Sequence, residues 1–254
     1  MENKFEKIWE RVDRLRETDK DYDDSVEELA YKQKEFREKL EAKKIPPEHV
    51  DEIAEDFSNE TLEKMEAQKE KFIDDLTKLK NRRALNEDIP QILSFENRKD
   101  RNCAMIMIDF DHFKEINDQF GHLAGDRALK KLSDILRNKI RHSDFLFRYG
   151  GDEFIVFFAE TDSREAVLLA EKIRKAVEES VISVIDKEGE EHNLKRTVSI
   201  GCVGTDQLLE WKNRSKKEID SKVDKIMEDM IIKADIALCE SKETHRNKVV
   251  VFRP

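Results

Sequence analysis

The sequence predicts an α+β protein in which helices pack on a mixed or antiparallel sheet, preceded by an all-helical region. Charged residues make up 42% of the 254-residue chain and hydrophobic residues 38%, with 7 glycines and 4 prolines, which favours long charged helices over a β-sandwich. From about residue 75, apolar runs of strand length alternate with segments of helical periodicity. The first seventy or so residues show helical periodicity only. We therefore expect two parts with different architectures.

Residues 5–40 carry a heptad repeat. Its a and d positions are Phe5, Ile8, Val12, Leu15, Asp19, Tyr22, Val26, Leu29, Gln33, Phe36 and Leu40. This spacing predicts a helix with an apolar seam, which the polar Asp19 and Gln33 weaken. Two interpretations stay open: a helical spacer or hairpin that packs on itself, and a coiled coil between two chains.

The segment "KKIPPEHV" ends this helix, because proline cannot continue one and Pro47 suits the first turn of the next. Further apolar positions predict one or two more helices and a helical junction to the second part: Val50, Ile53, Phe57, Leu62, Met65, Phe72, Ile73 and Leu76. No residue spacing here is typical of a metal, haem or nucleotide site.

The second part reads as a regular series of strands and helices. The expected elements are a strand at 103–110, a helix at 125–140, a hairpin whose second strand covers 152–159, a helix at 164–180, a strand at 193–204, a helix at 223–242 and a strand at 247–254. This β-α-β-β-α-β-α-β order predicts a helix layer on a mixed or antiparallel sheet.

Three carboxylates are predicted to meet at one edge of this sheet. The strand at 103–110 ends near Asp109, and "RYGGDEF" predicts a hairpin whose glycines supply positive φ and let another backbone or a ligand approach closely. Antiparallel pairing then places Asp152 and Glu153 beside Asp109. Like-charge repulsion makes such a cluster costly unless cations neutralise it, and hard divalent cations with nucleotide phosphates as co-ligands meet that need.

Charge and hydropathy exclude several classes of protein. The formal net charge of −10 argues against a protein that wraps duplex nucleic acid. No stretch reaches the roughly 18 to 20 apolar residues of a membrane span, and the charged beginning lacks the apolar centre of a signal peptide. We expect a cytoplasmic protein. Cys103, Cys202 and Cys239 lack metal-ligand spacing and are predicted to be buried thiols.

Three segments together carry a family resemblance. A "GGDE" turn alone is most often a solvated hairpin tip, but "IDFDHFKEINDQFGHLAGD", "RHSDFLFRYGGDEF" and "SKETHRN" follow one another in that order. Together they resemble the signature of the GGDEF-domain diguanylate cyclases. The resemblance covers about residues 72–254 and implies a palm-like fold of the nucleotide cyclase type. It leaves residues 1–71 as a helical regulatory or dimerisation region.

The resemblance implies the synthesis of cyclic di-GMP from two GTP molecules, with release of pyrophosphate. Asp109, Asp152 and the backbone carbonyl of Phe110 match the family's metal ligands, and Glu153 completes the cluster, with two Mg²⁺ or Mn²⁺ ions per active site. Either Asp152 or Glu153 helps to deprotonate the attacking 3′-hydroxyl group, and the sequence does not decide between them. Lys114 matches the position that contacts phosphate and stabilises charge in the transition state.

The resemblance also implies the residues that bind the nucleotide. Asn117 and Asp126 match the residues that bind guanine, and a carboxylate can accept hydrogen bonds from guanine N1–H and N2–H. His122 matches a position beside the substrate, although a histidine that only packs the turn is an equal alternative. Lys242 and Arg246 are four residues apart, which predicts that they share a face at a helix end and clamp the triphosphate.

Regulation is implied by a further pair. Arg141 and Asp144 form an RxxD pattern that matches the family's product-inhibition site, so we expect cyclic di-GMP to inhibit the protein. By the family mechanism each site binds one GTP, so two chains must meet as a homodimer. If residues 5–40 dimerise, they raise the effective concentration of the second half-site, and a regulatory protein could act through them.

The sequence departs from the family pattern at three positions. Lys78 and His245 stand where glycine is usual, which puts the local loop geometry in doubt, and Cys239 replaces a common tyrosine. The stretch "TDQLLEWKNRSKKEIDSKVDK" is longer than the usual connection. We expect a charged helical insertion there, with Trp211 as a packing anchor.

Two alternative functions remain. A module that binds GTP or cyclic di-GMP without turnover would lack an acid of the hairpin or the phosphate-binding cations, and this chain keeps both. A cyclase that also accepts ATP and makes mixed cyclic GMP-AMP is closer, although Asp126 favours guanine.

Overall fold

The computed structural model describes residues 70–212, 219 and 221–253, together with positions 34–36, 38, 39, 42, 43, 49, 50, 53, 56, 57, 60 and 61. The chain divides into two compact units, Met1–Lys71 and Phe72–Pro254. Each unit is described by itself below.

The described positions of the first unit are helical, apart from turns at Lys43 and Lys71. The rings of Phe36 and Phe57 stack with their centroids 4.1 Å apart. Phe36 is a seam position of the heptad repeat, so at this point the seam packs within the chain, as a helical hairpin requires. The other heptad positions between Phe5 and Leu40 lie outside the described residues, and pairing between chains stays a prediction.

The predicted helical junction is wrong at residues 71–77, which form turns and an isolated bridge from Ile73 to Lys80. The carboxylate of Asp74 accepts hydrogen bonds from the backbone N–H and the hydroxyl group of Thr77, at 2.8 and 2.6 Å. Lys78 then adopts a φ of 54°, a left-handed conformation that favours glycine. The departure at Lys78 therefore falls on a position where glycine would be less strained.

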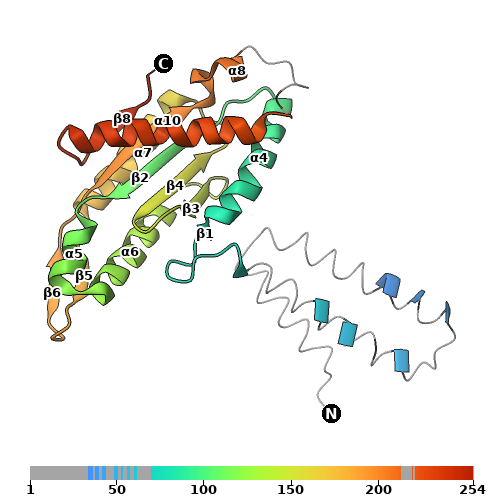
Figure 1. Ribbon diagram of the computed structural model, residues 1–254, viewed down its shortest axis with the longest axis horizontal. Helices are drawn as coiled ribbons and strands as arrows, with labels where there is room; N and C mark the ends of the chain where they lie inside the picture. Colours follow the sequence, from blue (N-terminus) through green and yellow to red (C-terminus); the bar gives the residue numbers. More distant parts are fainter. Residues whose placement is uncertain are drawn as a thin grey trace. The chain divides into compact units, whose positions relative to one another are not determined.

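The second unit contains the predicted series of strands and helices, with additions (Figure 1). Its elements are β1 (Lys80–Asn81), α4 (Arg82–Arg98), β2 (Ala104–Phe110), α5 (Phe113–Phe120), α6 (His122–Arg137), β3 (Phe145–Arg148), β4 (Glu153–Phe158), α7 (Ser163–Glu179), β5 (Ile182–Ile185), β6 (Glu191–Leu194), β7 (Val198–Gly204), the 3-10 helix η1 (Thr205–Gln207), α8 (Leu209–Lys212), α10 (Val223–Glu243) and β8 (Val249–Val251).

Six strands form one mixed sheet in the order β1-β3-β4-β2-β7-β8. The outer pairs β1–β3 and β7–β8 are parallel, and the pairs between them are antiparallel. Helices cover both faces of this sheet, so β2 and β7 are buried along their whole length. The predicted α+β class with a mixed sheet and flanking helices is confirmed.

Alternate side chains of β2 enter two separate cores. Ile106 and Ile108 pack with residues of α6 and α7 on one face. Met105 and Met107 pack with residues of α4 and α10 on the other. Figure 1 shows α10 lying along its face of the sheet, while α7 passes behind. The same alternation places Asp109, near the end of β2, on the face of the sheet that α10 covers.

Several elements differ from the sequence prediction, α5 among them, since no helix was predicted over Phe113–Phe120. The expected strand at 193–204 is two strands, because Asn193 and Leu194 pair with Ser183 and Ile182 in a separate β5–β6 hairpin. The sequence reading also assigned no helix to residues 82–98, where α4 forms with Pro90 inside it. The side chain of Asn81 caps this helix by accepting from the N–H groups of Arg83 and Ala84.

Trp211 is fully buried in α8, as the prediction of a packing anchor requires, while residues 213–218 and 220 of the insertion lie outside the described residues. Cys103 and Cys202 are buried, but Cys239 is exposed, so the prediction of a buried thiol is wrong there. Cys239 lies on the outer side of α10, next to the buried Leu238. Among the described residues, no helix combines the length and apolarity that crossing a membrane requires.

Candidate active site

The three predicted acids meet at the end of β2. The antiparallel register places Asp109 directly opposite Glu153, and the N–H group of Phe110 donates to the carbonyl of Asp152 at 3.2 Å. The predicted pairing is therefore confirmed. Asp109 is only 9% exposed, whereas Asp152 and Glu153 are half-buried. We refer to Asp109, Asp152 and Glu153 as the carboxylate rim.

Lys242, near the end of α10, compensates part of this negative charge. Its Nζ lies 2.7 Å from Oδ2 of Asp109. Burial raises the pKa of Asp109 to about 6, and the charges of Asp152 and Glu153 add to the effect of burial against the opposing effect of Lys242. Burial alone would lower the pKa of Lys242, but hydrogen bonding and attraction to Asp109 raise it. Three carboxylates thus share one ammonium group.

This arrangement fits a divalent cation. Carboxylate oxygens are hard ligands of the kind that Mg²⁺ and Mn²⁺ prefer. The raised pKa of Asp109 indicates that one lysine does not fully offset burial and like-charge repulsion, so further positive charge at the rim would be favourable. The residues that would hold the ion are Asp109, Asp152 and Glu153, with the backbone carbonyl of Phe110 predicted as a further ligand.

The positive φ predicted for the glycines of the β3–β4 turn is wrong. Gly121 and Gly189 are the glycines with positive φ among the described residues, so Gly150 and Gly151 are not left-handed. A β-carbon added to Gly150 would stand 2.5 Å from Oε2 of Glu153. Glycine is therefore favoured at position 150 because it has no side chain and leaves room for the carboxylate of Glu153. Its backbone conformation is one that other residues also adopt.

Lys242 and Arg246 do not share a helical face. The helix α10 ends at Glu243 with Thr244 as its C-cap, and His245, Arg246 and Asn247 all have positive φ. The prediction from four-residue spacing is wrong because the helix stops between the two cations. Arg246 instead lies with its Nε 4.0 Å from Oδ1 of Asp111, two residues after Asp109 on the chain.

The predicted guanine-binding residues are carried by α5 and α6. Asn117 lies on α5 and contacts the beginning of α6, where its Oδ1 occupies the place of a β-carbon on Gly125. Asp126 follows Gly125 directly on α6 and is half-buried. His122 begins α6 and is exposed, and Lys114 is exposed on the first turn of α5. Their roles toward a nucleotide stay predictions.

Arg141 and Asp144 lie in the turn between α6 and β3. The carboxylate of Asp144 accepts from the backbone N–H of Arg141 at 2.7 Å, and the Asp144 N–H donates to the Arg141 carbonyl at 3.0 Å. The acid therefore fixes the backbone of Arg141, whose side chain is exposed. Burial raises the pKa of Asp144, while the hydrogen bond and the charge of Arg141 oppose this.

The sequence analysis did not identify Asp74 and Arg148, which form an ion pair next to the turn that precedes Asp152. Nη1 of Arg148 lies 2.9 and 3.0 Å from the two carboxylate oxygens of Asp74. Nη2 and Nε of Arg148 donate to the Gly151 carbonyl at 2.7 and 3.2 Å. Burial raises the pKa of Asp74, but hydrogen bonds from Thr77 and Arg148 outweigh it and lower the value. Arg148 thus ties the turn before Asp152 to the beginning of the unit.

A signal for this pair was present, since Asp74 immediately precedes "DLTKLKNRRAL", the segment at residues 75–85 that contains Lys78, and Arg148 begins "RYGGDEF". Neither position reveals on its own that the two side chains meet, because they are 74 residues apart.

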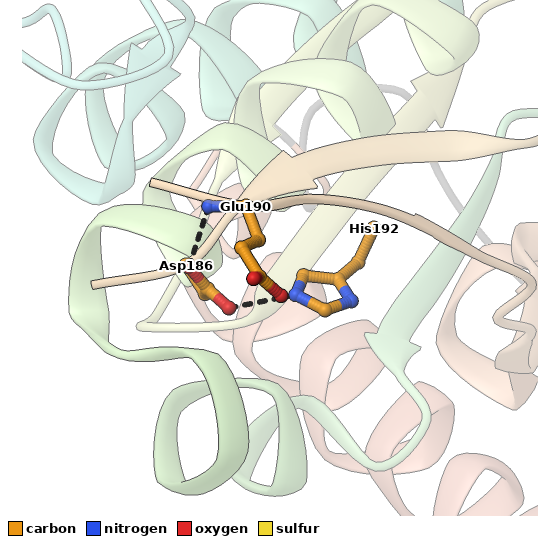
Figure 2. Close-up of side chains that lie close together, drawn as sticks. All are labelled: Asp186, Glu190 and His192. Carbon is orange, nitrogen blue, oxygen red and sulfur yellow. Dashed lines mark hydrogen bonds and ion pairs between the residues drawn. The ribbon is translucent and has the colours of Figure 1, made fainter. Parts of the chain in front are cut away.

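A second group of acids surrounds His192 in the β5–β6 hairpin (Figure 2). Oδ2 of Asp186 lies 2.7 Å from Nε2 of His192, and Oδ1 accepts from the N–H groups of Glu188 and Glu190 at 3.0 and 2.8 Å. The His192 ring also contacts the ring of Phe120 at the end of α5, with centroids 4.9 Å apart. These contacts close the hairpin turn and join it to α5, which accounts for the group structurally.

Comparison with known proteins agrees with this geometry. A family model described as "Diguanylate cyclase, GGDEF domain" matches residues 71–248. Diguanylate cyclase DosC of Escherichia coli K12 is 39% identical over 130 residues, which are 51% of this chain and 27% of DosC. Probable diguanylate cyclase DgcT of the same organism is 37% identical over 180 residues, which are 70% of this chain and 35% of DgcT.

Among solved structures, the GGDEF domain of DgcB from Caulobacter crescentus, in complex with c-di-GMP, superposes with a TM-score of 0.57 at 26% identity. The match covers 71% of this chain and 95% of that one. The chain spans about a third or less of the length of the two curated relatives. With residues 71–248 matched by the family model, the chain belongs to the GGDEF-domain diguanylate cyclase family.

Proposed function

We propose that the protein is a diguanylate cyclase that joins two GTP molecules into cyclic di-GMP and releases two pyrophosphates. The observation that carries the proposal is the carboxylate rim at the paired ends of β2 and β4, where Asp109 and Glu153 face each other and Lys242 binds Asp109. Membership of the family and similarity to named diguanylate cyclases support the same activity.

Each bond is formed by the 3′-hydroxyl group of one GTP attacking the α-phosphate of the other. The new P–O bond replaces the bond to the β-phosphate oxygen, pyrophosphate leaves, and the hydroxyl proton passes to Asp152 or Glu153. Two divalent ions at the rim would polarise the phosphate and lower the pKa of the hydroxyl group. Lys114, Lys242 and Arg246 bind the phosphates and offset the charge that develops on them.

Guanine is bound at the contact between α5 and α6 in this proposal. Asn117 and Asp126 offer an amide and a carboxylate that complement the hydrogen-bonding edge of guanine, and His122 lies beside the base. The close contact of Asn117 with the backbone at Gly125 supports a site of defined shape. Adenine lacks the N1–H and N2–H donors that a carboxylate would accept.

The active form is a homodimer with one GTP on each chain, since one rim binds one nucleotide. The helical region over residues 1–71 brings two chains together or receives a regulatory protein. Cyclic di-GMP inhibits the enzyme by binding Arg141, whose backbone Asp144 holds in place. The DgcB domain was crystallised with c-di-GMP, which supports a product site in the family.

The proposal is tested by incubating the full chain with Mg²⁺ and GTP, ATP or both, and separating the products by chromatography. We expect cyclic di-GMP from GTP alone and no cyclic product from ATP alone. A mixed cyclic GMP-AMP from the two nucleotides together would identify the promiscuous cyclase. A dimeric sample that binds GTP and forms no cyclic product would identify a binding module and overturn the proposal.

A further inference from the structure

We propose that Asp111 is a positioning residue for Arg246. Its buried carboxylate holds the tripeptide His245–Asn247 against the ends of β2 and β7, and so keeps the Arg246 guanidinium beside Asp111, two residues after Asp109 of the carboxylate rim. The inference rests on the proposed function in one respect, namely that Arg246 binds the triphosphate.

Asp111 is a buried acid with several hydrogen-bond donors. It is 1% exposed and lies directly after β2. Oδ1 accepts from the Ser199 hydroxyl group at 2.7 Å, and Oδ2 accepts from the Thr197 hydroxyl group at 2.7 Å and from the Asn247 N–H at 3.1 Å. One carboxylate thereby joins three segments of the chain that are far apart in sequence.

The tripeptide that Asp111 contacts needs such support. His245, Arg246 and Asn247 have φ values of 85°, 55° and 48°, which non-glycine residues rarely adopt, and three in succession are held only by surrounding contacts. The Arg246 N–H donates to the Ser241 carbonyl at 3.1 Å. The Asn247 side chain bonds Arg174 on α7, at 2.7 Å. The Asn247 N–H, which donates to Asp111, links the tripeptide to the residue that follows β2.

The same carboxylate also attracts Arg246 itself. The Nε of Arg246 lies 4.0 Å from Oδ1 of Asp111, while the Arg246 side chain stays 45% exposed. The guanidinium is thus held near a buried negative charge and remains accessible to an anionic ligand. Two acids that are two residues apart, Asp109 and Asp111, therefore attract one cation each: Lys242 in the last turn of α10, and Arg246 beyond the end of that helix.

A double-mutant cycle of Asp111→Asn and Arg246→Ala tests the inference in the full chain. The measurement is the dissociation constant of guanosine 5′-[α,β-methylene]triphosphate with Mg²⁺ by calorimetry, because this analogue cannot release pyrophosphate. We expect each single variant to bind the analogue about tenfold more weakly, and the double variant to bind no more weakly than Arg246→Ala alone. Effects that multiply to about a hundredfold would overturn the inference.

Asp206→Asn is the matched control. Asp206 is a half-buried acid at the other end of β7, and its carboxylate accepts from the N–H and hydroxyl groups of Ser163 at 2.9 and 2.7 Å. We expect this variant to lower thermal stability without changing affinity for the analogue. An equal loss of affinity in Asp206→Asn would mean that Asp111→Asn acts only through general stability, and would also overturn the inference.

A second variant covers a failure of Asp111→Asn to fold. Thr197→Val removes one hydroxyl donor and keeps the carboxylate, and it is carried through the same cycle with the same criterion. Product analysis with GTP separates the two proposals. If the protein forms cyclic di-GMP but the losses of affinity in the two single variants multiply in the double variant, only the role of Asp111 is contradicted. If the protein forms no cyclic product but the losses of affinity do not multiply, only the cyclase activity is contradicted.

Discussion

The β3–β4 hairpin and the β5–β6 hairpin each bring acids together with a basic side chain, but the two environments shift carboxyl pKa values in opposite directions. At the carboxylate rim, burial and the neighbouring acids raise the pKa of Asp109 to about 6 despite Lys242. In the β5–β6 hairpin, the hydrogen bonds from His192 and the Glu190 N–H lower the pKa of Asp186. Lys242 does not fully offset the effects of burial and neighbouring charge on Asp109, whereas hydrogen bonds within its own hairpin stabilise the charged form of Asp186.

This contrast shows that proximity of acids is not enough to indicate a functional site. Since the folded-state pKa of Asp109 is raised, its contribution to stability is fully present below its unfolded value of 3.8 and is lost as the pH rises through about 6. The pKa of Asp186 is lowered, so its contribution is present above 3.8 and is lost as the pH falls through the folded-state value. At neutral pH the rim thus opposes folding and favours a cation, whereas the Asp186 cluster supports folding.

The largest expected difference between the two hairpins is in activity. Asp109→Asn removes a predicted metal ligand and should lower kcat/KM for GTP about 10³-fold, while Asp186→Asn should leave it unchanged within about twofold. Cyclic di-GMP formation by the two purified variants measures both effects. Equal losses in the two variants would contradict the assignment of the active site to the rim.

Magnesium should stabilise the protein through the rim alone. At about 100 times its dissociation constant the ion should add about 2.7 kcal/mol at pH 8, and this gain should shrink as the pH falls through about 6, where protons compete for Asp109. Thermal unfolding with and without Mg²⁺ at pH 8 and pH 5 measures it. The gain should persist in Asp186→Asn and disappear in Asp109→Asn. Persistence in both variants would place the ion elsewhere.

A methyl group on Gly150 should disturb the active site more than the fold. The added carbon would stand 2.5 Å from Oε2 of Glu153, so the flexible acid must move while the backbone keeps its conformation. We expect turnover to fall about tenfold. Steady-state kinetics measure the loss, and Gly189→Ala in the other hairpin, which should leave turnover unchanged, is the control.

The smallest expected effect is on stability, which Gly189→Ala should lower more than Gly150→Ala does. Gly189 has a φ of 87°, so Gly189→Ala should lower the free energy of unfolding by about 1 kcal/mol through backbone strain. Gly150→Ala should cost less, because Gly150 has no positive φ. Denaturant titrations of the two variants compare them. A larger loss of stability in Gly150→Ala would show that its hairpin tolerates less change than its geometry indicates.

Much of the second unit follows from local sequence. The apolar runs at β2 and β4 and the periodicity of α7 and α10 predict these elements because strand alternation and helical spacing are local properties. The meeting of Asp109 with Glu153 was also predicted, from the acids at the end of one apolar run and the beginning of another, although the register that pairs them is set by the sheet. The order of motifs identified the family independently.

The errors arise where long-range contacts decide the local conformation. Lys242 and Arg246 have helical spacing, but the bond from Asn247 to Asp111 favours a left-handed path after Thr244. The strand expected at 193–204 divides because Asn193 and Leu194 pair with β5. Cys239 has apolar neighbours in sequence, although it faces outward from α10.

The sequence by itself determined the two-part organisation, the α+β class and the identity of the acids and cations, because these depend on residue type and spacing. Only the tertiary structure decided that Arg148 links Asp74 to the Gly151 carbonyl, that Asp111 contacts the segment carrying Arg246, and that one acid cluster is under-compensated while the other is satisfied. The physical reason is that charge compensation and hydrogen bonding depend on distance and burial, which residues far apart in the chain acquire only when they fold together.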